Sequence, residues 1–166
     1  MDRIVAWCAP WNDLFSHSSL ISGSVVGLHI MALVIGGGLA IAADRMTLRV
    51  RAGDESARRA QLGEVSAVHS IVLAGVVVLF ATGVALAASD VETFLPSPIF
   101  WAKLVLSFLL VVNGGLLTRV ERRLGGEGES ATVHDRLWAR VRLLSVSSVF
   151  LWVATAVVGI VLSNAA

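Results

Sequence analysis

Four long runs of apolar residues, separated by short polar segments, dominate the chain. They cover about residues 20–43, 65–88, 98–118 and 143–162 and contain almost no charge. A bilayer core about 30 Å thick takes about 20 helical residues to cross, because each residue adds about 1.5 Å. The apolar positions are continuous rather than alternating, and isolated strands would leave backbone groups unpaired in lipid. The pattern therefore predicts four transmembrane helices.

The composition supports an all-α transmembrane bundle that forms one domain over residues 1–166. Of the 166 residues 56% are hydrophobic and 15% are charged, whereas an ordinary soluble domain has about a quarter charged residues. The 13 Lys and Arg nearly balance the 12 Asp and Glu, so no overall field indicates nucleic-acid binding. A single cysteine, Cys8, excludes an internal disulfide and a Cys-type zinc framework.

The arginines predict the orientation of the bundle in the membrane. The connection 44–64 contains five of them and the connection 119–142 contains six, whereas the connection 89–97 contains acidic residues and no Lys or Arg. Loops rich in Lys and Arg stay on the cytoplasmic side. We therefore expect a bacterial inner-membrane protein with both Arg-rich loops in the cytoplasm and both termini outside.

Aromatic residues predict where the chain meets the two membrane surfaces. Residues 1–19 contain Trp7 and Trp11 among polar residues and Pro10 rather than an uninterrupted apolar stretch, which favours an amphipathic interfacial segment over a cleaved signal. Trp101 is expected at the same outer interface, and Trp138 at the cytoplasmic one.

Two histidines lie within the predicted spans, where ionisable residues usually have a function. His29 is about nine residues into the first helix, and His69 is about five residues into the second. Their levels differ on the order of 10 Å at about 1.5 Å per residue. Imidazole is a common ligand of haem iron, but this offset argues against one haem held by both rings. Two single-histidine sites, one haem with a weak second ligand, a proton relay, or hydrogen bonds to neighbouring helices remain as interpretations.

Three further polar residues belong to these helices. Lys103 either anchors the third helix at the outer surface or faces inward above His29, where it can pair with a haem propionate or a quinone oxygen. Asn113 lies near the level of His69 and is expected to hydrogen-bond it. Asp44, beside Arg45 at the end of the first predicted helix, is expected to form a surface ion pair.

Glycines accompany the histidines on the same helix faces. Gly36 lies seven residues after His29, and Gly83 lies fourteen after His69. Small residues at these positions permit either close helix packing or contact with a porphyrin edge, and helix packing is the commoner use. Gly23 and Gly27 form a small-xxx-small pair that can mediate dimerisation.

Several of these residues together resemble a known group of proteins. Leu28-His29-Ile30, followed by glycines and Asp44-Arg45, is similar to the first helix of small bacterial four-helix membrane proteins, and Pro98 to Leu104 with Asn113 is similar to their third helix. The wider group includes the copper-resistance D-like proteins and the HemJ-type protoporphyrinogen oxidases. The resemblance implies a b-type haem with His29 as ligand and Lys103 nearby. Asp44-Arg45-Met46 stands where HemJ-type proteins have a Pro-Arg string.

The leading functional hypothesis is a membrane protein that binds haem b for electron transfer or porphyrin handling, with a quinone or a membrane redox protein as partner. The site residues are expected to be His29, His69, Lys103 and Asn113, with the two histidines as iron ligands. The alternative is a cofactor-free accessory subunit that packs against a larger membrane complex, or against a second copy, through its glycines. A third hypothesis is a small transporter or proton relay. The sequence contains no Walker loop, HExxH motif, nucleophile elbow or evident pair of inward carboxylates.

Overall fold

The computed structural model describes residues 2–51, 54–124 and 131–165, and every regular element in them is helical. The elements are α1 (Asp2–His17), α2 (Ser19–Ala32), the π-helix η1 (Leu33–Gly37), α3 (Gly38–Arg49), α4 (Glu55–Ser89), α5 (Val91–Phe94), α6 (Pro98–Leu124) and α7 (Ala131–Ala165). Four helical stretches among the described residues are long and apolar enough to cross a membrane, namely Ser19–Arg49, Glu55–Ser89, Pro98–Leu124 and Val133–Asn164. They contain the four predicted spans and are consistent with an integral membrane protein.

All four helical stretches extend beyond the predicted spans, into the segments that contain the arginines. α4 begins at Glu55 rather than near residue 65, because Asp54 caps it and the Ala57 N–H donates to Asp54 Oδ1 at 2.9 Å. This hydrogen bond and a second from the Ser56 hydroxyl hold the pKa of Asp54 below its usual value. The extra turns contain Ala, Arg, Glu and Gln, which favour helix. The Gly-rich stretch 125–130, whose composition is typical of a loop, lies outside the described residues.

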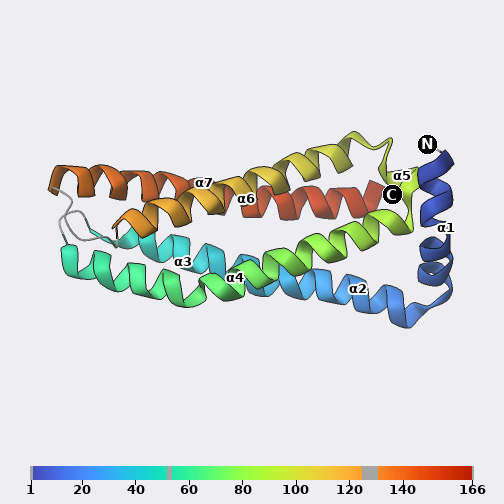
Figure 1. Ribbon diagram of the computed structural model, residues 1–166, viewed down its shortest axis with the longest axis horizontal. Helices are drawn as coiled ribbons and strands as arrows, with labels where there is room; N and C mark the ends of the chain where they lie inside the picture. Colours follow the sequence, from blue (N-terminus) through green and yellow to red (C-terminus); the bar gives the residue numbers. More distant parts are fainter. Residues whose placement is uncertain (1, 52–53, 125–130, 166) are drawn as a thin grey trace.

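The long helices form two antiparallel hairpins (Figure 1). One hairpin pairs α2, η1 and α3 with α4, the other pairs α6 with α7, and the packing between the hairpins is concentrated between α3 and α7. α1 crosses one end of the bundle, and both chain termini lie at that end (Figure 1). We call it the α1 end, and the opposite end, where α3 and α6 finish, the Arg-rich end. An even number of predicted spans requires both termini at one end, and the structure has them there.

Hydrogen bonds hold α1 across the end of α4. The Trp11 indole N–H donates to Ala85 O at 2.8 Å, and Asn12 Nδ2 donates to Ser89 O at 2.7 Å. Trp7 on the same helix is 85% exposed. The predicted interfacial segment is thus a helix that is attached to the bundle and leaves one aromatic ring free.

A small apolar core closes the Arg-rich end. It consists of Leu124, Leu137, Trp138 and Val141. Trp138 is 3% exposed, because the extended ends of α4, α6 and α7 surround its ring. The Arg58 guanidinium lies over its ring at 5.5 Å from the centroid.

Glycine permits close contact between α4 and η1. A Cβ added at Gly75 would lie 3.0 Å from the Gly36 Cα, so the two helices touch through their backbones. Gly36 therefore serves helix packing, the commoner of its two predicted uses. By contrast, a Cβ at Gly23 or Gly27 would meet nothing within 4 Å.

Candidate functional site

His29 is held by a hydrogen bond to the neighbouring α4. Its Nδ1 lies 2.8 Å from Thr82 Oγ1, and the Thr82 hydroxyl lies 2.6 Å from Val78 O. A hydroxyl has one proton, and a backbone carbonyl can only accept. The 2.6 Å contact favours donation from Thr82 to Val78, and we therefore assign the Nδ1 proton to His29. The Nε2 atom then has its lone pair free for a ligand.

Lys103 approaches this histidine from the other hairpin. It lies on α6, and a Cβ added at Gly159 of α7 would be 3.3 Å from its Nζ. The Lys103 ammonium is also the charged group whose electrostatic field acts on the His29 ring. The structure thus brings together His29, Thr82, Lys103 and Gly159, a group that we call the His29 site. Thr82 is the member that the sequence did not single out.

His69 lies far from this site. His29 contacts Thr82, which follows His69 by 13 residues on the continuous helix α4, or about 20 Å at about 1.5 Å per residue. This separation is larger than the offset expected from the sequence. One iron needs both ring nitrogens within about 2 Å, so the two histidines cannot ligate the same haem in this structure.

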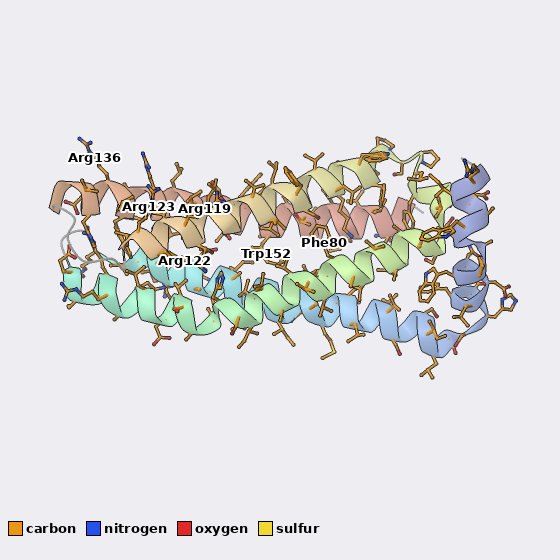
Figure 2. The ribbon with its side chains drawn as sticks, in the orientation of Figure 1. Phe80, Arg119, Arg122, Arg123, Arg136 and Trp152 are labelled. Carbon is orange, nitrogen blue, oxygen red and sulfur yellow. The ribbon has the colours of Figure 1, made fainter. Side chains whose placement is uncertain are left out.

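His69 lines a groove in the half of the bundle nearer the Arg-rich end. The groove has a volume of about 410 Å³ and is lined by α3, α4, α6 and α7. We call it the α4–α6 groove. Its walls are mostly apolar, and in Figure 2 Arg122 and Trp152 project from the α6–α7 hairpin toward α3 and α4. The polar residues that line it are Asp44, His69, Thr118, Arg119, Glu121, Arg122 and Ser148.

Asp44 does not form the surface ion pair that was expected. Its side chain is only 5% exposed, beside Ser145 and Ser148 of α7, and Glu121 of α6 is close enough to repel it electrostatically. Within the described residues neither carboxylate has a Lys, Arg or His partner within 4 Å. The sequence showed no evident pair of inward carboxylates, whereas the structure places Asp44 and Glu121 at the same groove. Because α3 continues to Arg49, Asp44 lies inside the bundle rather than at a helix end.

Asn113 does not hydrogen-bond His69 as expected. Its Nδ2 donates to Leu144 O at 3.1 Å, across the contact between α6 and α7. The side chain is 7% exposed, and Asn113 is not among the residues that line the α4–α6 groove. The Asn113 amide thus joins α6 to α7. His69 lines the α4–α6 groove without Asn113 as a partner.

Comparison with known proteins adds no relative from which a role could be transferred. No family model matches the chain, and no curated protein or solved structure shows significant similarity to it. The likeness to copper-resistance D-like and HemJ-type proteins stays a hypothesis. The roles of the two sites must therefore be argued from the side chains that form them.

Proposed function

We propose that this protein is a multi-pass protein of the bacterial inner membrane that binds b-type haem between its two hairpins. His29 is the axial ligand, and the haem serves electron transfer or porphyrin handling. The Arg-rich end faces the cytoplasm, because the arginines concentrate there. The α1 end then lies at the outer surface, with Trp7 and Trp11 at the interface.

The observation that supports this proposal best is the hydrogen bond from His29 Nδ1–H to Thr82. Histidines that bind metals almost always donate their other ring N–H to a nearby acceptor, which fixes the tautomer and the ring orientation. Thr82 is 8% exposed and its own proton is committed to Val78. His29 is thereby prepared as an Nε2 ligand before any iron is present.

The arrangement around His29 also suits the rest of a haem. The porphyrin of a haem has two propionate side groups, which are negatively charged. Lys103 supplies a positive charge from the opposite hairpin that can pair with them. The hairpins pack against each other mainly through α3 and α7, which leaves α2 and α6 less closely associated at the level of His29. Bound haem would supply a one-electron iron couple, while His29 and Lys103 hold and orient it. A lipid-soluble quinone or a membrane redox protein is the partner we propose, because the site lies within the spans.

His69 is the second candidate ligand, and its surroundings are less suitable. The α4–α6 groove has room for a cofactor and contains Arg119 and Arg122. The carboxyl groups of Asp44 and Glu121 are in the same groove, and they would repel the propionates of a haem. We therefore assign the haem to His29.

The test is a visible spectrum of the detergent-purified protein, expressed with ample haem, in its oxidised and dithionite-reduced forms. We expect a Soret band that shifts on reduction, sharpened α and β bands, and haem in constant ratio to protein. His29→Ala should lose the haem, whereas His69→Ala and the exposed control His17→Ala should keep it.

Two results would change the assignment. If His29→Ala retains haem and His69→Ala loses it, the ligand is His69. A flat spectrum from wild-type protein, together with a stoichiometric membrane protein that co-purifies, would instead support the cofactor-free accessory subunit.

A further inference from the structure

The α4–α6 groove opens on the outer surface of the bundle. Leu73 of α4 and Val111 of α6 line it from its two sides and are 55% and 44% exposed. In a membrane-spanning bundle this surface faces the hydrocarbon of the bilayer. The groove has a volume of about 410 Å³, within the range of small-molecule sites, about 300–1,000 Å³. A lipid can therefore enter it from the side, without passing through the bundle.

The apolar part of the groove has the length of one bilayer leaflet. On α4 its lining extends from Val65 to Val76, a separation of 11 residues or about 16 Å at about 1.5 Å per residue. Half of a hydrocarbon core about 30 Å thick is about 15 Å. Val65 is also where the apolar run 65–88 begins. The groove thus starts at the membrane surface of the Arg-rich end and finishes near the middle of the bilayer, as an acyl chain of that leaflet does.

Two arginines lie at the membrane-surface end of the groove. Arg119 directly follows the apolar run 98–118, and Arg119 and Arg122 both line the groove and are exposed. Guanidinium groups bind phosphate oxygens, often through two parallel hydrogen bonds, and basic pockets between transmembrane helices bind lipid head groups. The two arginines are therefore placed where the phosphate of a lipid in the groove would lie.

Carboxyl groups line the same groove without pairing with these arginines. Glu121 of α6 is half-buried and Asp44 of α3 is buried, so both lie deeper than the exposed arginines. Over the part of the chain that the structure describes, no ion pair within 4 Å joins either carboxylate to an arginine. A ligand with a charge of one sign would be attracted by one set and repelled by the other. A zwitterion can satisfy both.

From these observations we infer that the α4–α6 groove binds one phospholipid of the leaflet at the Arg-rich end, with a zwitterionic head group that contains a primary ammonium. The phosphate lies at Arg119 and Arg122, the ammonium donates toward Glu121, and one acyl chain follows α4 to the level of Val76. A primary ammonium has three N–H donors, whereas the quaternary ammonium of choline has none. Phosphatidylethanolamine therefore fits the groove better than phosphatidylcholine.

The experiment is native mass spectrometry of the full-length protein in detergent, freed of co-purified lipid and titrated with dioleoyl lipids that differ only in the head group. We expect one phosphatidylethanolamine per chain, bound about fivefold or more tighter than phosphatidylcholine or the anionic phosphatidylglycerol. Equal affinity for all three would mean non-specific surface lipid and would overturn the inference. Tightest binding of phosphatidylglycerol would make the groove an anionic-lipid site and would overturn the zwitterionic assignment.

A pair of double variants with the same net charge locates the phosphate. Arg119→Gln with Arg122→Gln should weaken phosphatidylethanolamine by about tenfold. Arg123→Gln with Arg136→Gln should bind it as wild type, because these two arginines are exposed and are not among the residues that line the groove. An equal loss in both double variants would show that overall charge, rather than the groove, attracts the lipid.

Glu121→Gln tests the position of the ammonium. It should remove the preference for phosphatidylethanolamine over phosphatidylcholine while leaving phosphatidylcholine binding unchanged, and a preference that persists in the folded variant would contradict the assignment. Size-exclusion elution and circular dichroism show whether the variant folds; if it does not, the comparison of the three lipids on wild-type protein decides the question. The inference needs only a membrane-spanning bundle. His29→Ala should bind the lipid as wild type, so a failure of the haem proposal would not affect this result.

Discussion

At the scale of single residues, one hydrogen bond determines what His29 can do. Thr82 accepts from Nδ1 at 2.8 Å and thereby leaves Nε2 available. Removing such a partner typically lowers metal affinity by about 10–100-fold. We therefore expect Thr82→Val to reduce haem affinity by about tenfold or more, measured by titrating haem into apoprotein and by haem content per polypeptide.

Thr82→Ser is the matched control, since it keeps the hydroxyl and loses only a methyl group. It should retain haem at close to the wild-type level. If Thr82→Val binds haem as tightly as wild type while remaining folded, the orientation of His29 does not depend on this bond.

The sequence predicted some site residues and missed others for a simple reason. His29 and Lys103 are conspicuous because they interrupt apolar runs. Asp44 and Glu121 lie at the ends of such runs, among arginines, where acids are usually exposed. Asp44 is buried and Glu121 half-buried because α3 and α6 extend beyond the apolar stretches, which hydropathy does not indicate.

At the scale of elements, the Arg58 side chain connects the ends of α4 and α7. Its Nη1 lies 2.8 Å from both Glu55 Oε1 and Asp135 Oδ1, and its guanidinium covers Trp138. The carboxylates are about half exposed or more, so they remain solvated if the arginine is removed. We expect Arg58→Met to lower the stability by about 1–2 kcal/mol, measured as a lower midpoint of thermal unfolding in detergent.

Arg59→Met provides the comparison, because Arg59 is the next residue of α4 and is exposed. Its unfolding midpoint should stay close to that of wild type. A similar loss of stability in both variants would show that total charge, rather than the contacts of Arg58, stabilises this end of the bundle.

At the scale of the whole molecule, the two hairpins meet where Trp152 of α7 lies against the other hairpin. A Cβ added at Gly37 would come within 2.9 Å of the Trp152 ring, whereas one at the adjacent Gly38 would meet nothing within 4 Å. Gly37→Ala should therefore push the hairpins apart and destabilise the fold by about 1–3 kcal/mol. Gly38→Ala should be neutral or slightly stabilising, because alanine favours helix. The midpoint of thermal unfolding is measured for both variants. Equal midpoints would mean that the contact between Gly37 and Trp152 does not affect how closely the hairpins pack.

The native cysteine allows a test of orientation, since Cys8 lies on α1 at one end of the bundle. If the α1 end is outside, a membrane-impermeant maleimide should label Cys8 in intact spheroplasts. In a Cys8→Ser background, Arg136→Cys, at an exposed position near the start of α7, should react only after permeabilisation. The reverse pattern of labelling would place the arginines outside.

The sequence by itself determined the number of long helices and their approximate centres. Because the number of spans is even, it also determined that both termini lie at one end. Apolar runs of this length have few alternatives to helix in lipid. Only the tertiary structure decided which polar residues meet. It paired His29 with Thr82, set His69 apart from it, and buried Asp44 beside Glu121. Such contacts depend on how far each helix continues, on its rotation and on where two glycines allow backbones to touch, and hydrophobicity along the chain does not specify these quantities.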